Sequence, residues 1–225
     1  MHIIPIAFIH NDFTEKFGVP RQSGIVPELR STIVFEPEFR NPDAIRGLED
    51  FSFLWLIWGF SETARDTWSP TVRPPRLGGN TRMGVFATRS PFRPNPLGLS
   101  SVKLDKIEKH PDLGMLLHVL GADMMDGTPI YDIKPYLAFT DSHEDASGGF
   151  ASDPQQRLTV AAAENISVLL PEETWQVLCD VLALDPRPAY QDDPDRVYGM
   201  SFGEYNIKFT VADDVLTVRD AEKRM

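Results

Sequence analysis

Apolar and polar residues alternate along many short stretches of this chain, and a period of two residues is typical of β-strands. The stretch at residues 113–120 is the clearest case, because Leu113, Met115, Leu117 and Val119 would share one buried face. Proline, glycine, asparagine and aspartate separate these stretches, as expected for turns. The pattern predicts strands at residues 3–9, 31–36, 51–60, 84–88, 99–107, 113–120, 130–133, 157–163 and 205–211, with a further strand through Leu216 and Val218.

The longest apolar run, FSFLWLIWGF at residues 51–60, is apolar at both odd and even positions. A strand with two apolar faces is typically buried on both of them. We therefore expect one face in a barrel or sandwich core, and the other against a second domain or a partner chain. A short buried helix is the alternative that this pattern leaves open.

Residues 171–184 show the period of a helix instead. Pro171 suits a first helical turn, and Glu172 and Glu173 lie where the positive end of the helix dipole favours carboxylates. The apolar stripe of this helix consists of Trp175, Leu178, Val181 and Leu182.

Many short strands and few helices predict a mainly β protein, in which an antiparallel barrel or sandwich precedes a small α+β domain. We place the first domain at residues 1–140 and the second at 157–225. Residues 141–156 between them are polar, acidic and rich in glycine and serine, which indicates a linker or mobile loop. Neither GxGxxG nor GxxxxGK[ST] occurs, so a Rossmann or P-loop nucleotide site has no support.

The composition narrows the setting of the protein. The 225 residues have a formal net charge of −11, which argues against nonspecific binding of nucleic acid over the whole surface. The single cysteine, Cys179, excludes an internal disulfide, and the five histidines lack ligand spacing, so we expect no metal site. The N-terminal residues do not resemble a signal peptide, and the longest apolar run is too short to span a bilayer as a helix. We therefore expect a cytoplasmic protein without a membrane segment.

One stretch departs from the acidic average. Residues 70–99 contain five arginines and no aspartate or glutamate, although the whole chain is acidic. Cations gathered without a carboxylate are costly unless an anion visits them, and RNA phosphates are such an anion. We expect RNA contacts from Arg73, Arg76, Arg82 and Arg93.

Single residues on the turns allow two interpretations. Arg89 could bind a ligand or pair with a carboxylate, and Asn95 could cap its own turn. Asp126 begins the turn DGTP, where an aspartate commonly bonds its own backbone. Spacing alone does not decide between these possibilities.

Four motifs taken together give the chain a family resemblance. The loop KFGVPRQSGIV, the run GVFATRSPFRPNPLGLS, the turn DGTPIYDIKPYL and the late LDPRPAY resemble the TsaA-like (TrmO) family over nearly the whole chain. This resemblance implies an S-adenosylmethionine-dependent methyltransferase that acts on N6 of the threonylcarbamoyl-modified adenosine beside the tRNA anticodon. It also implies an N-terminal β-barrel unlike the Rossmann methyltransferases, a small C-terminal domain and a homodimer.

The resemblance further implies where the cofactor binds. Ser61 and Glu62 stand where other members carry His-Gln, and this departure brings a negative charge toward the site. The matching cofactor-binding positions are Pro20, Arg21, Gln22, Ser61, Glu62, Arg89, Leu99, Asp126, Gly127, Thr128 and Pro129.

Chemical roles can be assigned to some of these positions. Asp126 is the expected general base, since the urea-like N6 is a poor nucleophile until its proton leaves. Arg21 or Arg89 suits the methionine carboxylate or an RNA phosphate, and Leu99 offers the adenine an apolar wall. Phe92 and Tyr136 either stack on an unpaired base or pack internally. The alternative to an enzyme is a non-catalytic module that binds S-adenosylmethionine and RNA.

Overall fold

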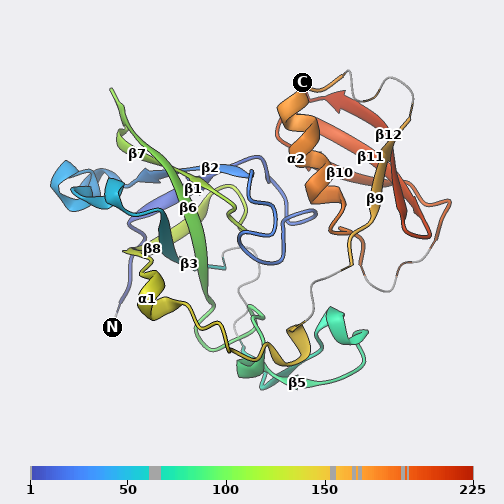
Figure 1. The fold of residues 1–225 in the computed structure, drawn as a ribbon, viewed down its shortest axis with the longest axis horizontal. Coiled ribbons are helices and arrows are strands. Elements are labelled where there is room, and N and C mark those ends of the chain that lie inside the picture. Colours follow the sequence, from blue (N-terminus) through green and yellow to red (C-terminus); the bar gives the residue numbers. More distant parts are fainter. Residues whose placement is uncertain are drawn as a thin grey trace.

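The computed structural model describes residues 2–60, 67–152, 156–163, 166, 169–188, 191 and 193–224. Six strands form a closed barrel in the order β1-β2-β7-β6-β3-β8, and every neighbouring pair is antiparallel (Figure 1). The expected fold class, a mainly β protein with an N-terminal antiparallel barrel, is confirmed. The barrel strands are β1 (Ala7–His10), β2 (Arg30–Phe35), β3 (Phe53–Gly59), β6 (Leu97–His110), β7 (Gly114–Leu120) and β8 (Thr128–Pro135).

Strand β3 is buried mainly on one face. Leu54, Leu56 and Trp58 point into the barrel core, as the alternation predicts. The expectation that both faces are buried is wrong at Phe53, which is 42% exposed. The opposite face is covered only in part, by the ring of Tyr136 near Trp55. The alternative of a buried helix is also wrong.

Gly98 on β6 lies directly under the ring of Trp58, its neighbour on β3. A Cβ atom at this position would come within 2.1 Å of the indole. Glycine is therefore required here because the tryptophan fills the inside of the barrel at that level.

The region before β6 differs from the prediction. Residues 84–88, expected as a strand, contribute only Gly84 to the two-residue strand β5 (Met83–Gly84), which pairs with β4 (Thr71–Val72). The chain then turns through a 3-10 helix at Val85–Ala87, in which Thr88 donates its hydroxyl to the Val85 carbonyl. This local hydrogen bond competes with a strand ladder.

A second sheet follows the barrel, in the order β10-β11-β12-β9, with one helix packed on it. Strand β10 has no counterpart in the prediction, although its buried residues Tyr198, Met200 and Phe202 alternate. These elements are β9 (Thr159–Ala162), α2 (Glu172–Leu182), β10 (Tyr198–Phe202), β11 (Tyr205–Ala212) and β12 (Val215–Lys223).

The remaining elements are short. None of the helices in the described ranges is long and apolar enough to cross a bilayer. The short helices are α1 (Ala138–Asp141) and the 3-10 helices at Pro37–Phe39, Pro42–Ile45, Leu48–Asp50, Pro75–Leu77 and Gly149–Ala151.

The loop between β1 and β2, residues 11–29, packs into the core of the second sheet. Phe13 and Leu29 are buried there, and Phe17 stacks on Phe209 of β11 with ring centroids 6.4 Å apart. The backbone N–H of Ser201 donates to the Glu15 carboxylate over 2.7 Å. In Figure 1 this loop, drawn in blue, lies between the barrel and the second sheet. The loop that carries Pro20, Arg21 and Gln22 is thus supported by the C-terminal part of the chain.

Candidate active site

Six strand ends meet at one rim of the barrel. Because neighbouring strands are antiparallel, the ends of β1, β3 and β7 lie beside the starts of β2, β6 and β8. At this rim, residues 11–29 connect β1 to β2, residues 121–127 connect β7 to β8, and residues 85–96 lead into β6. The topology therefore gathers the described segments in which the family resemblance placed cofactor-binding residues.

Arg89 and Gln22 meet directly at the rim. The Arg89 guanidinium donates to the side-chain oxygen of Gln22, 67 positions away in sequence. Arg21 is exposed beside Gln22, whereas Pro20 is buried. The loop is fixed because the Gly24 N–H donates to the Gly121 carbonyl over 2.8 Å. Of the two interpretations of Arg89, the structure thus shows contact with the predicted cofactor loop, and it records no ion pair of Arg89 with a carboxylate within the described ranges.

The turn that begins at Asp126 is tied to the end of β1. Asp126 Oδ1 lies 3.0 Å from His10 Nδ1 and accepts the backbone N–H of Asn11 over 3.2 Å. Gly127 has a φ of 74°, which favours glycine, and its N–H donates to the Ile9 carbonyl. Thr128 is buried, and it begins β8. Asp126 thus has a partner on another strand and is more than a local turn former.

Leu99 stands on the outer face of β6 and is 58% exposed. Its neighbours Gly98 and Ser100 point inward and are buried. An exposed leucine beside polar rim residues can offer an apolar surface to a flat ring.

Leu97 and Pro129 line a hollow of about 380 Å³ outside the same part of the barrel. Residues from the end of β3, the start of β6 and the start of β8 enclose it. Its lining consists of Ile3, Gly59, Phe60, Asn95, Pro96, Leu97, Pro129 and Tyr131.

Asp123 is a rim residue that the sequence analysis did not single out. Its Oδ1 accepts the hydroxyl of Ser100 over 2.5 Å, and the Ser100 oxygen accepts the indole N–H of Trp58 over 2.9 Å. Burial raises the pKa of the Asp123 carboxyl above its usual value, against the opposing effects of Ser100, backbone amides and the Arg89 charge. The only sequence signal was an acidic residue three positions before the DGTP turn, which by itself is unremarkable.

Ser61 and Glu62 lie outside the described residues. Within the described ranges, no group of three or more histidine, cysteine, aspartate or glutamate residues could hold a metal ion.

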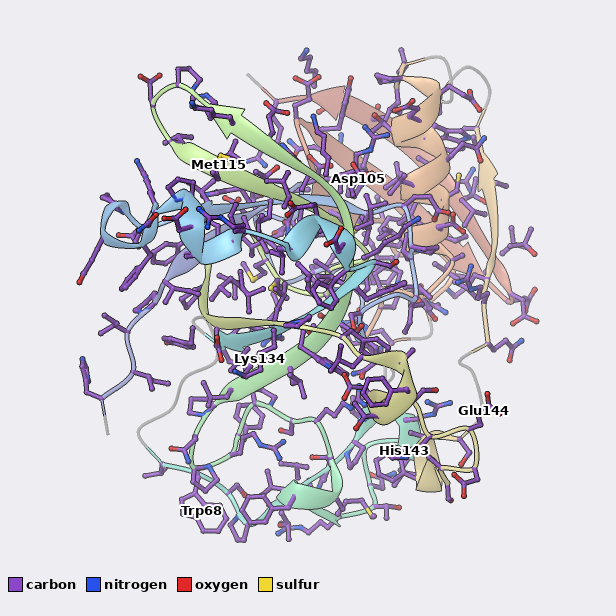
Figure 2. The ribbon with its side chains drawn as sticks, turned by 60° about the vertical axis from the view of Figure 1, so that its left-hand side comes forward. Trp68, Asp105, Met115, Lys134, His143 and Glu144 are labelled. Atoms are coloured by element: carbon purple, nitrogen blue, oxygen red, sulfur yellow. The ribbon has the colours of Figure 1, made fainter. Side chains whose placement is uncertain are left out.

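The predicted RNA-binding arginines lie on a segment that projects from the barrel, residues 67–93, which we call the arginine-rich segment. Arg73, Arg76 and Arg82 are exposed, and within the described ranges none of them forms an ion pair. Arg93 donates to the Thr88 carbonyl over 3.0 Å, which fixes its position. Figure 2 shows Trp68 at the outer edge of this segment, far from Asp105 and Met115 on the β6–β7 hairpin.

Two exposed aromatic rings accompany these arginines. Trp68 and Phe86 are 50% and 72% exposed and stack with centroids 6.3 Å apart, and the Arg93 guanidinium lies 5.9 Å from the Phe86 ring. Tyr136, a candidate for base stacking, instead packs against Phe53 and Trp55 after the end of β8, at the opposite rim. Of the two interpretations of Tyr136, the structure thus shows packing. Phe92 is half-buried beside Arg93.

A closed antiparallel barrel with polar loops gathered at one rim places the chain among β-barrel proteins, outside the nucleotide-binding α/β folds. Two family models match the chain: the tRNA-methyltransferase O N-terminal domain at residues 8–142, and the TrmO C-terminal domain at residues 155–224. The chain belongs to the TrmO family.

Individual relatives agree over the full length. The tRNA (adenine(37)-N6)-methyltransferase of Escherichia coli (strain K12) is 42% identical over 228 residues, covering 97% of each chain. A Pseudomonas aeruginosa relative, provisionally named an S-adenosylmethionine-dependent methyltransferase, is 38% identical, covering 91% of this chain and 90% of its own. The crystal structure of TrmO from Pseudomonas aeruginosa superimposes with a TM-score of 0.79 at 31% identity, covering 99% of this chain and 98% of that one.

Proposed function

We propose that this protein is an S-adenosylmethionine-dependent tRNA methyltransferase that methylates N6 of adenosine 37 carrying the threonylcarbamoyl group. The observation that carries the proposal is that one rim of a family-typical barrel gathers the Gln22–Arg89 contact, the exposed Leu99 and the Asp126 turn. The E. coli relative is named for methylation of the same nitrogen of adenine 37.

The rim residues suit S-adenosylmethionine by their chemistry. Arg21 and Arg89 present guanidinium groups for the methionine carboxylate, and Leu99 presents an apolar surface for the adenine ring. Asp126 suits a ribose hydroxyl or the ammonium group, and the backbone of Gly127, Thr128 and Pro129 closes the same side. The bound cofactor supplies an electrophilic methyl group on a positively charged sulfur.

Asp126 takes the role of general base. The N6 lone pair is delocalised into the neighbouring carbonyl, so the nitrogen reacts only as its proton is removed. His10 and the Asn11 N–H hold Asp126 Oδ1, and Oδ2 receives the proton. Positioning of the two reactants by the rim contributes the rest of the acceleration.

The arginine-rich segment holds the anticodon loop. Arg73, Arg76, Arg82 and Arg93 supply positive charge for phosphates, while Trp68 and Phe86 offer aromatic surface to an unpaired base. Binding that depends on phosphate contacts weakens as salt rises.

A transfer assay tests the function. The protein is incubated with methyl-labelled cofactor and bulk tRNA from cells that do or do not make the threonylcarbamoyl modification. We expect label only in the modified pool. Cofactor binding without transfer to either pool would instead favour a non-catalytic module that binds S-adenosylmethionine and RNA.

We propose that the protein works as a homodimer in the cytoplasm, where its tRNA substrate is found. The exposed apolar side chains Phe53, Leu137 and Phe139, which have no role at the proposed site, support an assembly surface. Light scattering after size exclusion gives the mass directly, and a monomer of 25.3 kDa at working concentration would contradict the dimer.

A further inference from the structure

We propose that Asp123 is the residue that distinguishes the cationic methyl donor from the neutral product of its reaction. The inference rests on the proposed function, because it assumes that S-adenosylmethionine binds at this rim. Its basis is a half-buried, anchored carboxylate located among the described cofactor segments.

The anchoring of Asp123 comes from inside the barrel. Ser100 is 1% exposed and donates to Asp123 Oδ1 over 2.5 Å, and Trp58, which is 6% exposed, donates to the Ser100 oxygen over 2.9 Å. We call Trp58, Ser100 and Asp123 the hydrogen-bond chain. A carboxylate held by a buried hydroxyl, which is itself held by a buried indole, keeps its position without reorganising when a ligand arrives.

The location of Asp123 places it among the predicted cofactor residues. It lies in the 121–127 loop, three residues before Asp126, and its partner Ser100 directly follows Leu99. The Arg89 charge and the Ser23 backbone amide of the cofactor loop both act on its carboxyl. Three rim segments therefore converge on this one carboxylate.

The negative charge of Asp123 is only partly compensated. Within the described ranges it forms no ion pair, and Arg89 directs its guanidinium to Gln22 instead. Burial outweighs its stabilising partners, so its pKa rises. A half-buried anion of this kind attracts a cation into the rim.

The methyl donor and the product differ by one charge at the same atom. Loss of the methyl group converts a sulfonium cation into a neutral thioether, while the adenine, ribose and amino acid stay the same. A carboxylate near that sulfur therefore favours the donor and releases the product. A carboxylate that binds the ammonium group would treat donor and product alike.

Isothermal titration calorimetry with S-adenosylmethionine, S-adenosylhomocysteine and sinefungin tests this role. Sinefungin carries a protonated amine in place of the methyl-bearing sulfonium, so it reports the same charge. We expect Asp123→Asn to weaken S-adenosylmethionine and sinefungin about tenfold and S-adenosylhomocysteine less than about twofold. Asparagine keeps an oxygen that can accept from Ser100.

Two further variants complete the design. Asp105→Asn removes the same charge from an exposed position on β6 and should leave all three affinities unchanged. Ser100→Ala keeps the Asp123 charge but removes the hydroxyl that holds it. The ratio of the affinity for S-adenosylmethionine to that for S-adenosylhomocysteine should therefore fall about threefold. This second variant decides the matter if Asp123→Asn does not fold.

The outcomes separate the two proposals. Equal weakening of all three ligands by Asp123→Asn, or no change in the ligand preference of either Asp123→Asn or Ser100→Ala, would overturn the role of Asp123. If the unmodified protein binds neither donor nor product, the proposed function itself fails.

Discussion

Buried serine and threonine residues lie in the barrel, whereas the second core is built from aliphatic and aromatic side chains, among them Tyr198 with a buried hydroxyl. The buried polar residues of the described chain are Ser31, Ser100 and Thr128, and all belong to barrel strands. The core between α2 and the C-terminal sheet instead gathers apolar side chains, including three from the 11–29 loop: Phe13, Val26 and Leu29. In the proposed function, the barrel carries the reacting groups, while the second core holds the 11–29 loop in place.

The largest expected effect comes from the second core. Phe209→Ala removes a fully buried ring that also stacks on Phe17, and it should lower the free energy of unfolding by about 3–5 kcal/mol. Urea unfolding followed by tryptophan fluorescence measures this. Because the 11–29 loop bridges both cores, we expect a single transition. Two separate transitions would show that the regions are independent.

Asp126 tests the chemical side of the comparison. Asp126→Asn should lower kcat for methyl transfer about 100-fold or more, since the base is lost, while the melting temperature changes little. Steady-state kinetics with threonylcarbamoyl-modified tRNA gives kcat and KM separately. An unchanged kcat with a raised KM would assign Asp126 to binding alone.

Arg89 should have an effect of similar or smaller size. Arg89→Ala removes the contact with Gln22 and a cation for the cofactor carboxylate, so cofactor affinity should fall about tenfold. Isothermal titration calorimetry measures the cofactor affinity. Arg219→Ala on β12, outside the rim, is the control and should leave this affinity unchanged. Unchanged affinity and activity would remove Arg89 from the site.

Gly18 tests the contact between the regions. Its φ is 93°, and a Cβ there would lie 2.2 Å from Met200 Sδ on β10. Gly18→Ala should cost about 2 kcal/mol and weaken cofactor binding through the loop. Gly47→Ala is the matched control, because its φ is 84° but nothing lies within 4 Å. Combined with Met200→Ala, Gly18→Ala should cost less than it does alone, so the double variant loses less stability than the sum of the two single variants, whereas Gly47→Ala and Met200→Ala should add.

The smallest effect is a pH dependence. Burial raises the pKa of Asp123 in the folded state above that in the unfolded state, so the folded state binds the proton more tightly. The free energy of unfolding of the unmodified protein should therefore fall, relative to Asp123→Asn, as pH rises from the unfolded pKa through the folded one. Asp12, whose pKa burial also raises, titrates in both proteins and cancels. If the free energy of unfolding of the unmodified protein and of Asp123→Asn changed with pH in the same way, the raised pKa of Asp123 would be contradicted.

Much of the fold follows from local pattern, and the exceptions have local causes. Alternation located β2, β7 and β11 within about a residue, because one face of each is buried. It failed at residues 84–88, where Thr88 bonds its own turn, and at Phe53, where apolar character did not produce burial. Strand β10 was missed although Tyr198, Met200 and Phe202 alternate in its sequence, because the residues between them are a glycine and a serine, which are typical of turns.

The site divides in the same way. Motifs singled out Gln22, Arg89 and Asp126 as candidates, and the structure brings the first two into contact across 67 positions. Asp123 was not identified from the sequence because its hydrogen bonding depends on Ser100 and Trp58. These residues come close to Asp123 only when β3, β6 and the 121–127 loop are assembled. No motif or residue spacing in the sequence predicts that contact.

The support of the 11–29 loop by the last strands also sets an order of events during synthesis. The loop leaves the ribosome early, yet its partners on β10 and β11 follow about 180 residues later, and Arg224 reaches back to Thr14. At about 5–20 residues per second, the loop waits roughly 10–40 s for its supporting core. We therefore expect the nascent protein to complete its rim, and with it the proposed site, only when nearly its last residue has been made.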